Sequence, residues 1–484
     1  MVYGKQVLSV LALIGALASA AGQARAAGTP ERPPNLLFIL MDNIGQDWFG
    51  CYGSLEGQTP EIDKLAAGGV RFRHCYVVPL CSTSRHVFFT GRYPFRTGWT
   101  IHHDAAIYGG GYFDWNREIS FVRVLQSAGY ATALGGKWQI NHLFDQPDAL
   151  TKHGFDEHCV FPEGPRGHPA HTKRYWDPYV LRDGRRARAE GQFGPQLFTD
   201  YLIDFMRRHR DRPFLAVHST VLTHVPVTKT PLNRDEDLTE REQLAGMVRY
   251  ADHCVGRLVK ALDDLGLREN TVVMITTDNG TPAVYGGRVG GRVFQAAAST
   301  MVEGDMKEGS IDVPMIVNCP GLVPGGRVSD ALVDASDVFP TLVELAGAEC
   351  PKGVTIDGRS FAPILRGAPD AASPRAWIFS QYAHQCLVRD HRYKLRSDGR
   401  FHDLVRDPLE ERDLAGSTEP AVVRERAKLQ RVLDSLPPDA EPWFEPRSIS
   451  ARRLKIGGDG RRASDAKLAP EDPTARPPGA GSPK

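Results

Sequence analysis

Short apolar runs alternate with amphipathic segments along most of the chain. Between the runs, apolar residues recur with a helical period behind Pro195 and again over residues 244–265. Such alternation predicts an α/β fold in which helices flank a large, mostly parallel sheet. The runs that read as buried parallel strands are residues 35–41, 131–134, 213–218, 271–276 and 313–317.

The pattern changes near residue 377. Three short strand-like runs, at 377–382, 385–389 and 393–396, predict a small antiparallel sheet. A helical pattern at 422–436 is expected to pack on this sheet. Beyond Phe444 large apolar residues almost disappear, which predicts a disordered tail. We therefore expect a main domain at 33–370, a C-terminal subdomain at 371–440 and a tail at 445–484.

The first 26 residues have the pattern of a signal peptide. Lys5 precedes an apolar run at residues 7–18, and small residues follow. No later run approaches the roughly 20 apolar residues of a spanning helix. We therefore expect a secreted or periplasmic protein with no membrane span once residues 1–26 are removed.

Charge and cysteine content exclude several classes of function. Lysine and arginine number 59 and aspartate and glutamate 58, so no overall field favours nucleic acid or an anionic membrane. The 8 cysteines form no CxxC pair, which argues against a zinc or disulfide scaffold.

Two Asp-Asn pairs follow predicted strands. Asp42 and Asn43 come after the run at 35–41, and Asp278 and Asn279 come after the run that begins at residue 271. Ligands collect beyond the carboxyl ends of strands in open α/β sheets, so these four side chains could meet at one cation. Their oxygen donors suit calcium or magnesium rather than zinc. A plain Asn-Gly turn is the alternative for the second pair.

The segment from Cys81 to Arg92, CSTSRHVFFTGR, resembles the sulfatase signature, CxPSR followed by a TGR element. Further motifs follow the order and spacing of sulfatases of the alkaline phosphatase superfamily, from about residue 33 to about residue 415. They are Pro34-Asn35, Thr59-Pro60, Gly136-Lys137-Trp138, His153-Gly154-Phe155-Asp156, Thr223-His224-Val225-Pro226, Thr277-Asp278-Asn279-Gly280 and Asp357-Gly358-Arg359-Ser360.

The resemblance implies a fold, a nucleophile and a cofactor. The main domain would be alkaline phosphatase-like and catalytic. Cys81 would be oxidised to formylglycine by a formylglycine-generating enzyme and hydrated to a diol, in which one hydroxyl attacks sulfur and the other later ejects sulfate. The cation, Ca2+ or possibly Mg2+, would be held by Asp42, Asn43, Cys81, Asp278 and Asn279.

Three further site residues, Arg85, Lys137 and His224, are also implied by the resemblance. Position 81 would begin a helix, and Arg85 would hold the nucleophile oxygen. Lys137 and His224 match the basic residues that bind the sulfate oxygens and protonate the leaving oxygen. Two more candidates come from the residues themselves. Gln139 could hydrogen-bond the nucleophile. Lys307, four residues after Glu303, is either a further cation for the sulfate or a solvated loop lysine.

Five positions depart from the family pattern: Asn43, Thr83, Gln139, Glu303 and Asp312. Asn43 replaces an aspartate, which would weaken cation binding. Thr83 replaces the proline read by the modifying enzyme. Gln139 replaces a histidine, and Glu303 and Asp312 replace basic residues, which would make the anion pocket less positive.

Three functions are compatible with these residues. The first is hydrolysis of an organic or carbohydrate sulfate ester. The second is hydrolysis of a phosphate or phosphonate ester, and the third is a catalytically impaired sulfatase-like protein that binds a glycan or a partner. The insert at residues 162–191 is either a contact for an anionic sugar or a solvated loop with a few packed aromatics. Its candidate contacts are Arg166, His168, His171, Lys173, Arg174, Tyr175 and Trp176.

Overall fold

The computed structural model describes residues 32–101, 113–163, 173–289, 292–293, 306–370, 373, 375–383 and 385–437. The predicted signal peptide, the predicted tail at 445–484 and Glu303 lie outside these residues.

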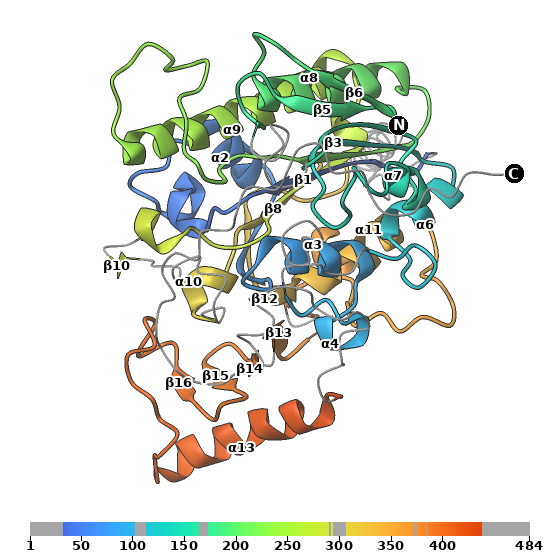
Figure 1. Cartoon of the computed structure of the whole chain (residues 1–484). Helices are drawn as coiled ribbons and strands as arrows, with labels where there is room; N and C mark the ends of the chain where they lie inside the picture. Colours follow the sequence, from blue (N-terminus) through green and yellow to red (C-terminus); the bar gives the residue numbers. More distant parts are fainter. Residues whose placement is uncertain are drawn as a thin grey trace, which may run out of the picture.

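A ten-stranded mixed sheet forms the centre of the molecule (Figure 1). Its strand order is β12-β2-β11-β8-β1-β7-β3-β4-β5-β6. The five strands from β8 to β4 run parallel. The sequence predicted four of them, β1, β3, β7 and β8, and missed β4. The bounds are β1 (Asn35–Met41), β2 (Val70–Tyr76), β3 (Ala131–Lys137), β4 (Glu157–Phe161), β5 (Tyr179–Arg182), β6 (Arg185–Arg188), β7 (Phe214–Ser219), β8 (Thr271–Thr277), β11 (Met315–Asn318) and β12 (Arg327–Asp334).

The prediction of a parallel strand at 313–317 was wrong. β11 runs antiparallel to both of its neighbours, β2 and β8. The chain leaves β8 at its carboxyl end, and the short helix α10 (Glu308–Ile311) lies against that same end, where the Gly280 amide donates to the Ser310 carbonyl at 3.0 Å. Because β11 starts from the edge at which β8 stops, it has to run in the opposite direction.

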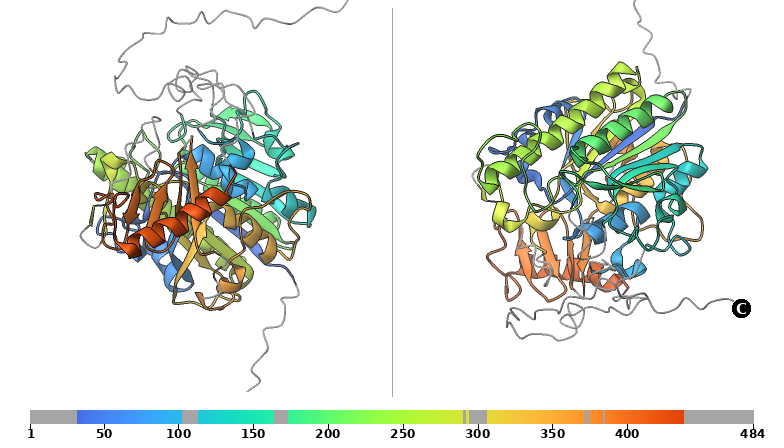
Figure 2. Two further views of the ribbon diagram at one scale, coloured as in Figure 1. Left: turned by 90° about the horizontal axis from the view of Figure 1, so that it is seen from below. Right: turned by 45° about the horizontal axis from the view of Figure 1, so that its top comes forward.

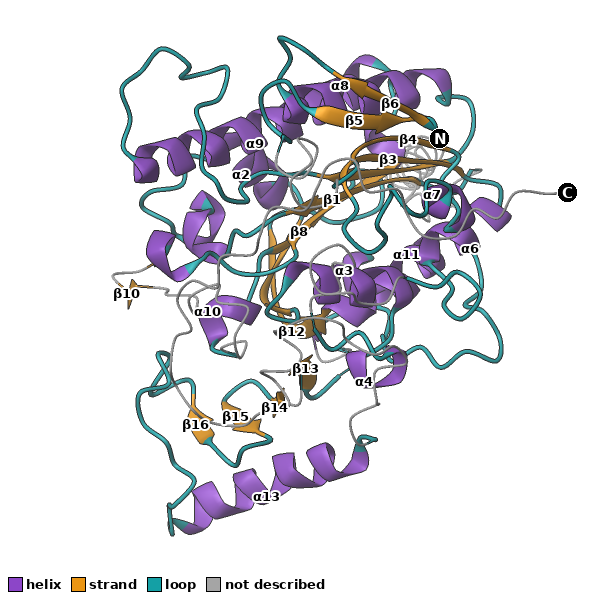
Figure 3. Ribbon diagram, in the orientation of Figure 1, coloured by secondary structure: helices purple, strands orange, loops and turns teal. Residues whose placement is uncertain are grey.

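Helices cover both faces of the sheet (Figure 3). Alternate residues of β1 enter two different cores, Leu36 and Phe38 on one face and Leu37 and Ile39 on the other. One face carries α3 (Cys81–Thr90), α6 (Phe121–Ser127) and α11 (Val338–Leu345), and the other carries α2 (Pro60–Ala67), α8 (Gly194–Arg208) and α9 (Glu240–Asp264). Smaller helices are α4 (Pro94–Thr97), α7 (Ala149–Lys152) and α12 (Ala362–Leu365).

The two long helices begin where their sequences indicate. Pro195 occupies the first turn of α8, where its missing N–H is not needed. Thr239 caps α9 in a capping box with Glu242, so each side chain bonds the backbone N–H of the other residue. Both helices therefore have locally encoded starts and apolar faces that pack on the sheet.

The predicted C-terminal sheet and helix are confirmed. Strands β13 (Ile378–Tyr382), β14 (Gln385–Arg389), β15 (Tyr393–Arg396) and β16 (Phe401–Asp403) form an antiparallel sheet. Helix α13 (Pro420–Ser435) lies across it and buries Val422 and Leu429 against it (Figure 2). No helix within the described residues is long and apolar enough to cross a membrane.

We expect His218 to make unfolding sensitive to acid. Its ring is buried on β7, where Nε2 lies 3.2 Å from the Thr199 hydroxyl, and burial lowers its pKa from 6.5 to about 4. The unfolded chain therefore binds more protons below pH 6.5, and stability is lost as the pH falls from 6.5 to 4, by about 3 kcal/mol for this group. In denaturant unfolding between pH 6.5 and 4, the free energy of unfolding of His218→Gln should fall by about 3 kcal/mol less than that of the parent protein. A variant profile parallel to the parent's would contradict this assignment.

Candidate active site

The two Asp-Asn pairs meet at the carboxyl edge of the sheet. β1 and β8 are parallel neighbours, and Met41 pairs in register with Thr277. The residues that follow each strand are therefore neighbours. The backbone N–H of Asn43 donates to Asp278 Oδ1 at 3.2 Å, and Asn279 Nδ2 donates to Asn43 Oδ1 at 2.8 Å. Asn43 adopts a left-handed backbone conformation with φ of 56°.

Cys81 is the first residue of α3, as predicted. Its side chain is 4% exposed, and burial raises its pKa to about 11, with Lys137 opposing the rise and Asp278 adding to it. The unmodified side chain is therefore a protonated thiol, which is a poor nucleophile. Thr83 is also buried, and its hydroxyl donates to the Leu80 carbonyl at 2.7 Å.

Arg85 lies at the centre of the cluster. Its Nε and Nη2 lie 2.9 Å and 2.7 Å from Asp278 Oδ2, and its Nη1 donates to the Lys137 carbonyl at 3.1 Å and to the Ser219 hydroxyl at 2.5 Å. The side chain is fully buried. Arg85 therefore ties α3 to the ends of β3, β7 and β8.

The sequence did not single out Ser219. It ends β7, the strand beside β1, so the rule that placed the Asp-Asn pairs at the sheet edge would also have pointed to Ser219.

Lys137 ends β3 and pairs with Asp42. Lys137 Nζ lies 2.6 Å from Asp42 Oδ2, and both side chains are buried. Burial opposes ionisation of Asp42, but Lys137, His224 and Arg85 outweigh it and lower the pKa of this carboxyl. Burial and the charge of Asp42 raise the pKa of Asp278 to about 6. Two carboxylates and two cations thus lie together in a water-poor site.

His224 lies in a loop held to the end of β1. The Thr223 amide donates to the Asp42 carbonyl at 2.7 Å, and His224 Nδ1 lies 2.6 Å from the Val225 carbonyl. Because a carbonyl only accepts, Nδ1 must carry the proton. Burial and then Lys137 lower the pKa of His224 to about 3, so the ring is neutral and its Nε2 has no proton to donate.

The remaining predicted residues are placed as follows. Gln139 is 9% exposed and lies two residues beyond β3 in a left-handed conformation with φ of 67°. Lys307 is exposed and immediately precedes α10. The structure thus puts Gln139 at the site edge and Lys307 near the turn after β8, and their contact with substrate stays a prediction.

Asp312 is a buried carboxyl beside Gln46. Its Oδ1 accepts from Gln46 Nε2 at 3.0 Å. Burial and then Glu308 raise its pKa well above the usual range. The carboxyl of Asp312 therefore binds a proton more readily than a solvated aspartate does.

The donor set fits a hard divalent cation. Asp42 Oδ1 and Asn279 Oδ1 are shielded from solvent and have no hydrogen-bond partner, which leaves two oxygens free for a ligand at the edge where β1 and β8 end. Within the described ranges, no group of three or more His, Cys, Asp or Glu side chains is placed to hold a metal. A cation at this edge would therefore rely on two carboxylates and two amides, a donor set that favours weak rather than tight binding.

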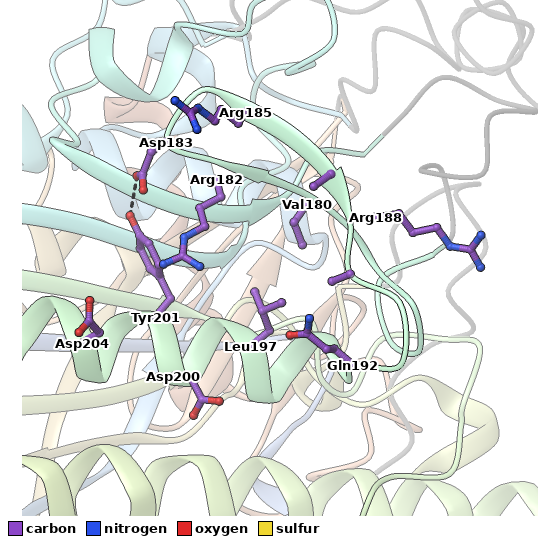
Figure 4. A pocket seen from close by; sticks show the side chains of 12 residues that line it. Val180, Arg182, Asp183, Arg185, Arg188, Gln192, Leu197, Asp200, Tyr201 and Asp204 are labelled. Carbon is purple, nitrogen blue, oxygen red and sulfur yellow. Dashed lines mark hydrogen bonds between the residues drawn. The ribbon is translucent and has the colours of Figure 1, made fainter.

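A cavity of about 760 Å3 lies elsewhere, between the β5–β6 hairpin and α8 (Figure 4). Arg182 stacks over the Tyr201 ring, and the Tyr201 hydroxyl donates to Asp183 at 2.6 Å. None of the predicted site residues lines this cavity. Its arginines are balanced by aspartates, so we assign no ligand to it.

Comparison with known proteins identifies the family. The Sulfatase family profile matches residues 34–348, and the profile of the N-sulphoglucosamine sulphohydrolase C-terminal region matches residues 304–436. The N-acetylgalactosamine-6-sulfatase of Canis lupus familiaris is 35% identical over 378 residues, which cover 72% of this chain and 69% of the relative. Arylsulfatase A of Homo sapiens is 31% identical over 429 residues, covering 81% and 80%.

Solved structures agree on the fold. Ps i-CgsB superposes with a TM-score of 0.71 at 22% identity, covering 87% of this chain and 97% of that one. The phosphonate monoester hydrolase of Agrobacterium radiobacter gives 0.63 at 19% identity, covering 83% and 95%. The fold is therefore that of the alkaline phosphatase superfamily, and the chain belongs to the sulfatase family of sulfuric ester hydrolases.

Proposed function

We propose that this protein hydrolyses the sulfate ester of a carbohydrate or another organic molecule, with the oxidised form of Cys81 as the nucleophile. The observation that carries the proposal is the position of Cys81: it starts α3 beside Arg85, Lys137 and both aspartates. The N–H groups at the start of a helix favour an anion. The 35% identity to an N-acetylgalactosamine-6-sulfatase makes hexosamine 6-sulfates the first substrates to test.

The chain's own residues have distinct tasks in this proposal. Asp42, Asn43, Asp278 and Asn279 would hold Ca2+ or Mg2+, which would supply charge neutralisation for the ester oxygens. Arg85 fixes Asp278 and the start of α3, and Lys137 faces the sulfate oxygens. Formylglycine at position 81 would supply a hydrated aldehyde with two hydroxyl groups.

His224 can donate a proton only after its Nε2 has been protonated. In its resting form Nδ1 donates to the Val225 carbonyl and Nε2 is unprotonated. An anionic ester bound beside the ring would raise its pKa, because the negative charge favours the imidazolium. We therefore propose that His224 takes up a proton on substrate binding and passes it to the leaving alcohol oxygen.

Mass spectrometry of the peptide containing residue 81 tests the nucleophile. We expect the aldehyde or its hydrate in protein exported from a host that contains a formylglycine-generating enzyme. Only unmodified cysteine in active protein would end the formylglycine mechanism. A parallel panel of aryl sulfate, hexosamine 6-sulfate, phosphate diester and phosphonate substrates tests the reaction, and turnover of phosphorus esters alone would favour the phosphate or phosphonate alternative.

We also propose that residues 1–26 direct export, so that the mature enzyme is secreted or periplasmic, and that the catalytic domain and C-terminal subdomain have the boundaries 33–370 and 371–440. N-terminal sequencing of the exported protein would locate the cleavage point.

Asn43→Asp is expected to tighten cation binding. The substitution adds a full negative charge beside Asp278, while the side-chain oxygen at this position can still accept from Asn279. We expect the Kd for Ca2+ to fall by about tenfold, because affinity rises with the number of charged ligands. Calorimetric titration of chelator-treated protein with Ca2+ measures this. Asn116→Asp, on an exposed turn, adds the same charge elsewhere and should leave Kd unchanged. Equal effects of the two variants would show that Asn43 is not a ligand.

A further inference from the structure

Arg174 is a buried cation for which the described residues provide no counterion. Its side chain is 7% exposed, and its Nε is shielded from solvent with no hydrogen-bond partner. Within the described part of the chain it makes no ion pair, and its guanidinium lies over the Phe161 ring at 5.0 Å from the centroid. The comparably buried Arg85, Arg375 and Arg389 each pair with a carboxylate. An isolated charge is expensive to bury, so Arg174 calls for an anionic partner that the described residues do not supply.

Arg174 lies at the same edge of the sheet as the candidate active site. Phe161, beneath its guanidinium, is the last residue of β4 and pairs in register with Lys137 on β3. Tyr175, the next residue, donates its hydroxyl to the carbonyls of Val221, at 2.9 Å, and His224. The charge of Arg174 also helps to lower the pKa of His224. The Arg174 guanidinium therefore lies over β4, the strand next to the one that carries Lys137.

This position suits a second anion rather than the reacting sulfate. Cys81, Arg85 and Lys137 gather at the ends of β1, β3 and β8, where the reacting ester is proposed to bind. Arg174 lies beyond β3, over β4, with an aromatic ring beneath it. A guanidinium offers two parallel N–H donors, which match the oxygens of a sulfate or a carboxylate.

We propose that Arg174 is a specificity-determining residue that binds a second anionic group, a sulfate or a carboxylate, on the sugar that carries the reacting sulfate ester. The inference rests on the proposed function, and it names the substrate class as multiply charged. A substrate with one charge leaves Arg174 unpaired, whereas a substrate with two supplies the missing counterion. The doubly charged substrate is therefore expected to bind more tightly, because it pairs with Arg174 and the singly charged one does not.

Binding measurements test the preference directly. Calorimetry on the Cys81→Ala protein compares N-acetylglucosamine 6-sulfate with glucosamine 2-N,6-O-disulfate, and a 6-sulfated hexosamine alone with one linked to a uronate. We expect tighter binding of the doubly charged member in at least one pair, and Arg174→Gln should reduce that preference by about tenfold while changing affinity for the singly charged member within about twofold. Arg174→Lys should give an intermediate preference, because lysine keeps the positive charge but lacks the two parallel N–H donors of the guanidinium.

Arg182→Gln is the matched control. Arg182 also lies over an aromatic ring, that of Tyr201, but it lines the separate cavity beside α8, so its loss should leave the preference unchanged. No preference for either doubly charged ligand in the parent, or equal losses for both members of a pair in Arg174→Gln, would overturn the inference. Turnover of 4-nitrophenyl sulfate by the parent is measured separately: its absence would count against the proposed function, while the binding ratios would still decide the role of Arg174.

Discussion

Cys81→Ala is expected to abolish sulfate ester hydrolysis, with kcat/KM lowered by at least about 10³. The substitution removes the atom from which the nucleophile is made and leaves the rest of the cluster in place. Initial rates on 4-nitrophenyl sulfate and on a hexosamine 6-sulfate measure the loss. Thermal unfolding of the variant should stay close to that of the parent, because the thiol makes no ion pair and is small.

Two further variants give this prediction its controls. Cys81→Ser keeps one hydroxyl, which can attack sulfur but has no second hydroxyl to eliminate sulfate, so we expect a stalled sulfated serine detectable by mass spectrometry. Cys350→Ala removes an exposed cysteine and should retain full activity. A Cys81→Ala protein that keeps activity within about tenfold of the parent would exclude position 81 as the source of the nucleophile.

Arg85→Ala should lower the free energy of unfolding by about 3–5 kcal/mol in chelator-treated protein, because it leaves Asp278 as a buried charge without its partner. It also removes hydrogen bonds to Ser219 and to the Lys137 carbonyl. Urea unfolding followed by circular dichroism measures the change. Added Ca2+ should recover part of the loss, since a cation beside Asp278 replaces some of the missing charge.

An exposed arginine provides the comparison. Arg366 pairs with Glu344 at 2.5 Å, but both side chains are solvent-exposed, so Arg366→Ala should change stability by no more than about 1 kcal/mol. Arg85→Lys should fall between the two, because it retains the charge but cannot reach Asp278, Ser219 and the Lys137 carbonyl together. Equal stability losses in Arg85→Ala and Arg366→Ala would mean that the Arg85–Asp278 pair is not the strong buried interaction described above.

Strands with a strong apolar pattern were predictable, and strand direction was not. The run at 35–41 became β1 with its predicted bounds because every residue in it is buried. The run at 313–317 is equally apolar, yet β11 is antiparallel, because its direction depends on where α10 brings the chain back to the sheet. β2 was missed since its sequence, VRFRHCY, contains basic residues that a buried strand rarely carries.

Part of the site could be predicted from the positions at which the strands end. Asp42 and Asp278 could be placed together because parallel neighbouring strands end at one edge. The family motifs identified Cys81, Arg85, Lys137 and His224 as candidates for their chemical roles. The neutral state of His224 depends on contacts between distant parts of the chain and on burial, which residue patterns do not record. The same holds for the lack of a counterion for Arg174 among the described residues.

Every residue of α3, from Cys81 to Thr90, is buried in the folded protein. A modifying enzyme has to bind the residues around its target. Here Cys81 and the three residues that follow it, Ser82, Thr83 and Ser84, are all buried. Any oxidation of Cys81 must therefore occur while this segment is still unfolded. The fraction of active molecules would then depend on the rate of Cys81 oxidation relative to the rate of folding. Slower folding, rather than greater stability, would favour a higher yield of active enzyme.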